Sequence, residues 1–128
     1  MSRYTVGVLR ELSASHFLIG GDWGRENQPH SHDYRVEAIF EGDALERHGY
    51  LVDISVVEKH LDVVLARYRG RMLNELPELE SKNPSLERFA RLVAEGLARA
   101  LAPETLEALT VKLWESPQAF ATYTVSFR

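Results

Sequence analysis

The chain has 128 residues and a mass of 14.6 kDa, a size typical of one domain, so we expect a single domain over residues 1–128. It contains no cysteine, which excludes disulfides, thiolate metal sites and cysteine nucleophiles. A formal net charge of −4 without a strongly basic segment argues against a nucleic-acid partner, and no apolar run approaches the ~20 residues of a membrane span. With no apolar signal-peptide core near residue 1, these features predict a soluble cytoplasmic protein without a membrane partner.

Alternating apolar and polar residues predict strands in the first part of the chain. Residues 4–12 show this alternation, and a Gly-rich polar stretch over residues 20–29 predicts a loop of a length that usually carries function. From His30 to Phe40 the even-numbered residues share one face, so we expect a half-buried strand there. A further short strand is expected at residues 50–53.

Two helices are expected next. Ser55 and Glu58 have the spacing of a capping box, and apolar residues then repeat at helical intervals over residues 57–68. The Asn-Pro pair at residues 83–84 favours the start of a second helix, because proline is tolerated at the first helical position. Apolar residues at helical spacing over residues 86–101 supply the buried face of this helix.

Alternation returns at the end of the chain, where residues 111–115 and 119–127 predict two more strands. Strands, then helices, then strands is an order typical of the α+β class. We therefore expect an antiparallel sheet with helices packed on it.

Histidines form the sharpest local pattern. His30 and His32 lie two residues apart on a predicted strand, so their side chains share a face about 6.6 Å apart, from where imidazoles can converge on one metal ion. His16 could complete a three-histidine site that leaves a fourth position open, as in catalytic zinc sites. Among five histidines, one such pair also arises by chance, so the spacing alone leaves both interpretations open. His48 and His60 lack this geometry and are expected to be solvent-exposed.

Two glutamates are further candidates. Glu115 falls in phase with Val111 and Leu113 on the inward face of its strand, and a buried carboxylate is costly unless it is paired or liganded. A strand end that faces water is the alternative for Glu115. Glu26 lies in the polar loop four residues before His30, and taken alone it is a solvated loop residue.

Several short motifs occur in a characteristic order along the chain. They are Ser-Ala-Ser-His-Phe at residues 13–17, His-Ser-His-Asp-Tyr at 30–34, Gly-Tyr-Leu-Val-Asp at 49–53, Leu-Asn at 73–74, Pro-Ser-Leu-Glu-Arg-Phe-Ala at 84–90, and Glu115 followed by Tyr123. In order and spacing they resemble the motifs of the 6-pyruvoyl-tetrahydropterin synthase family, which includes the 6-carboxy-tetrahydropterin synthases of the queuosine pathway. Ser31 stands where the family's His-Gly-His motif has glycine.

The resemblance implies a fold, an assembly and a set of site residues. The family fold, called the tunnelling fold, is a four-stranded antiparallel sheet with two helices on one face. Three such sheets close into a barrel, trimers stack into hexamers, and active sites lie between subunits, so we expect a trimer or hexamer. The implied zinc ligands are His16, His30 and His32. The implied residues for a small pterin-like substrate are Glu115, Ser85 and the backbone near Leu86.

The chain departs from the family at its catalytic positions. Glu26 stands where the family has its catalytic cysteine, and Arg69 and Gly70 stand where it has an Asp-His pair. One branch of the family carries glutamate in place of cysteine and cuts the substrate side chain to give 6-hydroxymethyl-dihydropterin. Glu26 resembles that branch and is our candidate catalytic base. Arg69 is either a contact for an anionic substrate group or an exposed arginine at a helix end.

Two functional hypotheses follow. The first is a zinc-dependent lyase acting on a dihydropterin such as 7,8-dihydroneopterin triphosphate, with a product that differs from the usual one. The second is a non-catalytic pterin- or purine-like binding protein that retains the fold and the metal. The conversion of dihydroneopterin triphosphate in the presence of zinc discriminates between them.

Overall fold

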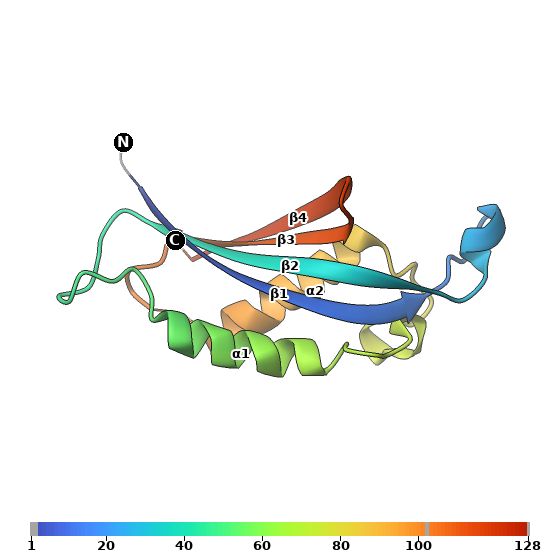
Figure 1. The fold of residues 1–128 in the computed structure, drawn as a ribbon, viewed down its shortest axis with the longest axis horizontal. Helices are drawn as coiled ribbons and strands as arrows, with labels where there is room; N and C mark the ends of the chain where they lie inside the picture. The colour runs from blue at the N-terminus through green and yellow to red at the C-terminus, as the bar shows by residue number, and fades with distance from the viewer. Residues whose placement is uncertain (1–2, 102, 128) are drawn as a thin grey trace.

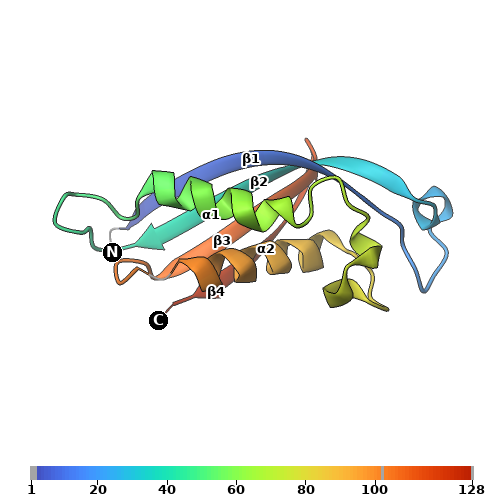
Figure 2. The ribbon, with the colours of Figure 1, turned by 90° about the horizontal axis from the view of Figure 1, so that it is seen from below.

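A computed structural model describes residues 3–101 and 103–127 of the chain. Four strands form one antiparallel sheet in the order β1-β2-β3-β4, and two helices cover one of its faces (Figures 1 and 2). The strands are β1 (Tyr4–His16), β2 (His30–Gly42), β3 (Ala108–Ser116) and β4 (Ala119–Ser126), and the helices are α1 (Ile54–Ala66) and α2 (Leu86–Ala100). The expected α+β class and the two helices on one face are confirmed.

Strands β1 and β2 form a long ribbon. Each has 13 residues, and they pair without interruption from Tyr4 opposite Gly42 to His16 opposite His30. The first strand therefore runs four residues beyond the expected end at Leu12. The ribbon carries the histidines to one end of the molecule, far from the loop that joins β2 to α1 (Figure 1).

The core lies between the sheet and the two helices. Alternate residues of each strand point toward the helices and meet their buried faces, since side chains in a strand alternate between its two sides. The buried helical residues are Val57, Leu61 and Leu65 from α1, and Phe89, Ala90, Val93, Ala94 and Leu97 from α2. Full burial of a Val, Leu or Phe side chain contributes roughly 1.5–3 kcal/mol, so this layer holds the helices against the sheet. Among the residues described, no helix is long and apolar enough to cross a membrane.

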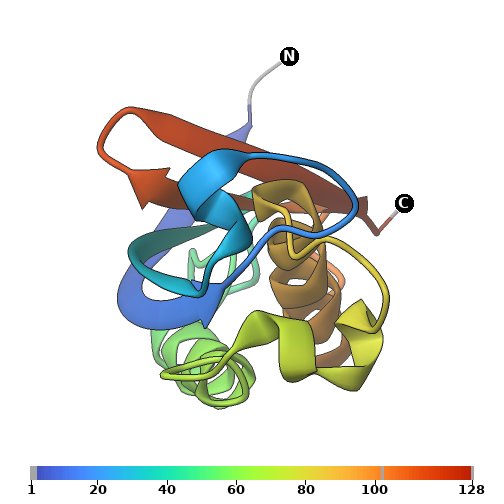
Figure 3. The same cartoon turned by 90° about the vertical axis from the view of Figure 1, so that its right-hand side faces the viewer.

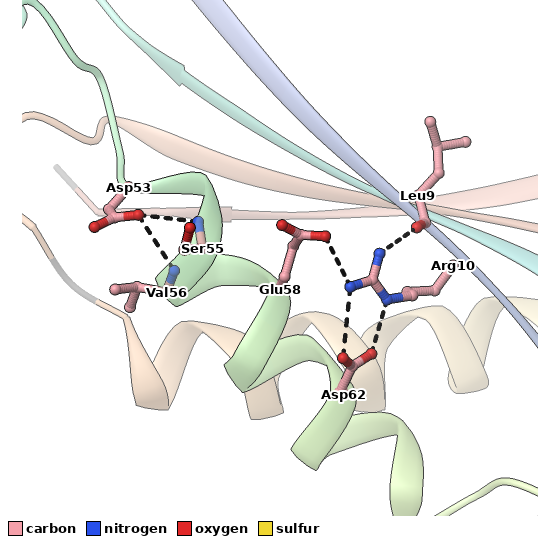
Figure 4. Close-up of polar contacts among 7 residues, drawn as sticks. All are labelled: Leu9, Arg10, Asp53, Ser55, Val56, Glu58 and Asp62. Carbon is pink, nitrogen blue, oxygen red and sulfur yellow. Dashed lines mark hydrogen bonds and ion pairs between the residues drawn. The ribbon is translucent and has the colours of Figure 1, made fainter.

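The start of α1 differs from the prediction. Residues 50–53 form no strand, and the helix begins at Ile54 with Asp53 as its N-cap. The Asp53 carboxylate accepts hydrogen bonds from the backbone N–H groups of Ser55 and Val56 (Figure 4). The predicted capping box is wrong because Ser55 lies inside the helix, and the carboxylate of Asp53 caps the helix instead.

Glu58, the other member of the expected box, has a different partner. The guanidinium of Arg10 on β1 donates to Glu58 at 3.0 Å and to Asp62 at 2.8 Å, and so ties α1 to the edge of the sheet (Figure 4). These bonds raise the pKa of Arg10 and lower that of Asp62. Glu58 thus stabilises packing between β1 and α1 and not the helix end.

The second helix also begins later than expected. Its first residue is Leu86, and the Ser85 hydroxyl accepts a hydrogen bond from the backbone N–H of Arg88, as an N-cap does. The Asn-Pro pair at residues 83–84 therefore precedes the helix. The loops before it contain short 3₁₀ helices at Gly24–Asn27, Leu73–Glu75 and Pro77–Leu79.

Candidate active site

Three histidines meet at one end of the β1–β2 ribbon. The register places His16 opposite His30, and His32 follows on the same face of β2. One ring nitrogen from each lies within 4.8 Å of the others, and the ring centroids are 4.5 to 5.0 Å apart. His16 is 5% exposed, whereas the other two are half-buried. The three histidines that the sequence analysis singled out as candidate metal ligands therefore form one cluster.

The cluster has the properties of a metal donor set. Burial, together with the neighbouring rings of His30 and His32, lowers the pKa of His16 to about 4, so this imidazole is neutral at physiological pH. The Nδ1 atom of His30 lies 2.8 Å from the backbone oxygen of Gln28, which can accept its proton and leave Nε2 for a metal. Neutral imidazoles are preferred zinc ligands, and three of them leave a fourth position open. The residues present thus fit a zinc ion.

Two asparagines fix the chain just after His16. The Asn74 side chain forms two hydrogen bonds of 2.9 Å with the backbone of Phe17, one to its N–H and one to its carbonyl. Asn83 accepts a hydrogen bond of 2.7 Å from the N–H of Ile19. Sequence reasoning missed these contacts, because no local pattern reports a bond between residues about 60 positions apart.

A pocket of about 570 Å³ opens beside His16. Figure 3 looks onto this end of the molecule, where the loop between β1 and β2, the chain before α2 and the β3–β4 turn come together. The candidate residues in its wall are His16, Glu26, Ser85, Leu86 and Glu115. Pockets for small organic ligands have volumes of roughly 300–1,000 Å³. The structure therefore brings the sequence candidates from four separate segments into one cavity of suitable size.

The two glutamates are held in different ways. Glu26 belongs to the 3₁₀ helix Gly24–Asn27, where its backbone oxygen accepts a hydrogen bond of 2.8 Å from Leu18, and its side chain is exposed in the single chain. Glu115 continues the inward face of β3 beyond Leu113, but it is only half-buried because the pocket opens there. Burial of Tyr34, and to a smaller extent the negative charge of Glu115, raise the pKa of Tyr34 above its usual value.

Arg69 and Gly70 lie along the outer edge of β1. The Arg69 guanidinium donates to the carbonyl of Glu11 at 2.9 Å, and the N–H of Gly70 donates to the carbonyl of Ser13 at 2.7 Å. Gly70 has a φ of 71°, a left-handed conformation that favours glycine. Arg69 is exposed, and this bond to the edge of β1 is its side-chain contact in the structure as described.

The remaining two histidines differ from the cluster. His48 is exposed as expected, with its Nδ1 atom 2.9 Å from Glu46. His60 is half-buried on α1, which the exposed interpretation did not anticipate. Neither belongs to the group of three histidines whose ring nitrogens come together among the described residues.

Comparison with known proteins identifies the relatives of this chain. The family model for 6-pyruvoyl tetrahydropterin synthase matches residues 5–126. The chain is 28% identical over 120 residues to the 6-carboxy-5,6,7,8-tetrahydropterin synthase of Bacillus subtilis, covering 88% of this chain and 79% of that protein. Its fold is similar to that of the 6-pyruvoyl tetrahydropterin synthase of Caenorhabditis elegans, with a TM-score of 0.83, 22% identity and 98% of each chain covered. The Plasmodium vivax enzyme of that name gives a TM-score of 0.81 at 16% identity, over 98% of this chain and 99% of its own. Because the family model spans almost the whole sequence, the chain belongs to the 6-pyruvoyl tetrahydropterin synthase family.

Proposed function

We propose that this chain is a zinc-dependent lyase-type enzyme that acts on a dihydropterin such as 7,8-dihydroneopterin triphosphate. The observation that carries the proposal is the pocket of about 570 Å³ shared by His16, Glu26 and Glu115. Family membership supports pterin chemistry, since the relatives are named as 6-pyruvoyl and 6-carboxy tetrahydropterin synthases.

Glu115 and the start of α2 bind the pterin ring in this proposal. The Glu115 carboxylate accepts two parallel N–H donors from the guanidine-like edge of the ring, a charge-assisted match of planar groups. The Ser85 hydroxyl already accepts from Arg88, so its own proton remains for an acceptor on the same ring edge. The backbone near Leu86 forms the adjacent wall of the pocket.

His16, His30 and His32 would hold the zinc ion. Zinc bound there supplies Lewis-acid stabilisation of negative charge on an oxygen of the substrate side chain. Glu26 acts as the general base that takes a proton from that side chain. A structure of the Plasmodium vivax 6-pyruvoyltetrahydropterin synthase carries alanine in place of a glutamate described as a catalytic residue, so a catalytic glutamate has a precedent in this fold.

The residues at the family's catalytic positions narrow the reaction. Gly70 has no side chain to move a proton, and Arg69 cannot deprotonate in a protein. Glu26 is then the one titratable group among the three positions, whereas the 6-pyruvoyl reaction needs two separate proton movements. A single base suffices for a retro-aldol cut or an epimerisation of the substrate side chain, and we propose a reaction of that kind.

The edges of the sheet support assembly with further copies of the chain as a trimer or hexamer. Contacts from residues 69–71 cover the outward backbone groups of β1 from Glu11 to Ser15. Over residues 3–101 and 103–127, no hydrogen bond covers the outward side of Thr5 and Gly7, and β4 forms the opposite edge. Uncovered edges of this kind favour pairing with another strand, here β4 of a second copy.

The mass of the particle in solution tests this assembly. Light scattering at micromolar concentration should give the mass of a trimer or hexamer, and the mass of a monomer would contradict the proposed assembly.

A second candidate is a binding protein that keeps the pocket without catalysis. The observation in its favour is the exposure of Glu26 in the single chain, together with the structural contacts of Arg69. Product analysis separates the two functions: the zinc-loaded protein is incubated with 7,8-dihydroneopterin and with its triphosphate. We expect a product with a shortened or epimerised side chain. Binding without turnover favours the second candidate, and formation of the 6-pyruvoyl product at family-like rates contradicts the proposed reaction class.

A further inference from the structure

Tyr34 lies beside the histidine cluster and is almost fully buried. It follows His32 on the helix-covered face of β2 and is 2% exposed. Its hydroxyl oxygen lies 3.3 Å from Nδ1 of His16, and its ring centroid is 5.7 Å from that of His32. A buried tyrosine hydroxyl normally has a hydrogen-bond partner, and here that partner is the His16 ring.

A row of aromatic rings holds Tyr34 in place. Its ring meets Phe89 of α2 edge to face, with centroids 5.1 Å apart, and Phe89 meets Tyr68 in the same way at 5.2 Å. Phe89 is 1% exposed and Tyr68 is 4% exposed. Edge-to-face contacts in a packed core restrict ring orientation, so the position of the Tyr34 hydroxyl is set by the core and not by solvent.

We propose that Tyr34 is a positioning residue of the metal site, whose hydroxyl engages Nδ1 of His16 and so reserves Nε2 of that ring for the metal. The inference rests on the zinc site of the proposed function. It assigns a role to a residue that touches a histidine ligand and not the metal itself.

The chemistry of imidazole explains why such a partner matters. A neutral imidazole binds a metal through one nitrogen while the other carries a proton, and the acceptor of that proton sets the orientation of the ring. The backbone oxygen of Gln28 is placed to be this acceptor for His30, and the hydroxyl oxygen of Tyr34 is placed to be it for His16. Outer-shell partners alter metal affinity by roughly 10–100-fold, and because the Tyr34 contact of 3.3 Å is long for a hydrogen bond, we expect the lower end of that range.

The test compares two tyrosine-to-phenylalanine variants in the same aromatic row. Tyr34→Phe removes the hydroxyl that contacts His16, and Tyr68→Phe removes a hydroxyl from the far end of the row. Zinc affinity is measured by competition with a chromophoric chelator, and the ligand geometry by the visible absorption of the cobalt-substituted protein. We expect Tyr34→Phe to bind zinc about tenfold more weakly and to shift the cobalt bands, whereas Tyr68→Phe matches the wild type in both.

Three outcomes separate this inference from the proposed function. A wild type that binds no zinc overturns both. Wild-type zinc binding with an unchanged affinity and cobalt spectrum in Tyr34→Phe overturns the role of Tyr34 alone. If Tyr34→Phe does not fold, NMR of ring nitrogens in zinc-loaded wild type decides: the His16 proton should be on Nδ1, and a proton on Nε2 contradicts the proposal.

Discussion

Two hollows of similar volume lie at opposite ends of the molecule, and the chain builds them in different ways. The pocket beside the histidine cluster, about 570 Å³, has walls from β1, the following loop, the start of α2, β3 and β4. The other hollow, about 530 Å³, is lined by one continuous stretch between residues 46 and 55, at the far end of the sheet (Figure 1). The two hollows have similar volumes. They differ because segments distant in sequence converge on the first, whereas a single segment lines the second.

Both hollows contain a histidine and acidic groups, so residue type does not distinguish them either. The side chain of His48 is 63% exposed, and its contact with Glu46 is screened by water. His16 is 5% exposed, and burial among other rings keeps it neutral and able to bind a metal. The comparison shows that the surroundings of a histidine, more than its presence, indicate a functional site.

The largest expected effect comes from removing one ligand at the clustered end. His32→Ala should abolish stoichiometric zinc binding, since two imidazoles remain where catalytic zinc sites use three protein ligands. Elemental analysis after dialysis measures the zinc content. His48→Ala, in the other hollow, is the matched control and should keep about one zinc per chain. If His32→Ala kept as much zinc as His48→Ala, the metal would have to bind at a different place.

The next effect concerns catalysis. Glu26→Gln keeps the shape of the side chain and removes the base, so turnover of the dihydropterin should fall by roughly 10²–10⁴-fold. Single-turnover rates, measured with zinc-loaded protein, report this loss. Glu46→Gln makes the same chemical change in the other hollow and should leave the rate unchanged. A full rate in Glu26→Gln would exclude Glu26 from the mechanism.

Much of the fold could be predicted from the sequence, and so could part of the difference between the histidine cluster and the hollow lined by residues 46–55. Period-two alternation identified the strands and placed His30 and His32 on one face, because that pattern is local. The expected end of the first strand was too early, since pairing with β2 extends β1 through polar residues to His16. Register depends on two segments at once, so the meeting of His16 with His30 could only be a hypothesis until β1 and β2 were paired.

The pocket was harder to predict than the cluster. Only the family resemblance indicated that Ser85 and Leu86 belong to the site. The local sequence can predict a helix N-cap, but it does not show which distant residues face that cap across a pocket. Strand phase placed Glu115 on the inward face and left open whether it was buried or faced water at the strand end; the opening of the pocket leaves it half-buried. Tyr34 shared the alternating face with His30 and His32, and that phase was the one signal that could have identified its contact with His16.

Substrate binding should depend on Glu115 more weakly than catalysis depends on Glu26. Hydrogen bonds to a charged group contribute roughly 1.5–3 kcal/mol each, so Glu115→Gln should weaken binding of a pterin by about 10–100-fold. Isothermal titration calorimetry of zinc-loaded protein with 7,8-dihydroneopterin gives the affinity. Glu46→Gln is again the control from the other hollow. An unchanged affinity in Glu115→Gln would move the ring-binding role to another part of the pocket.

The smallest effect tests whether the hollow lined by residues 46–55 is only structural. Asp53 lines it and caps α1, and loss of an N-cap costs about 1 kcal/mol, so Asp53→Ala should lower the free energy of unfolding by that amount without changing zinc affinity. Urea denaturation measures the stability. Ser55→Ala is the matched control: only its backbone N–H takes part in the cap, so its effect should stay within about 0.5 kcal/mol. A larger loss for Ser55→Ala would restore the capping box that the sequence suggested, and weaker zinc binding in Asp53→Ala would show that the two ends are coupled.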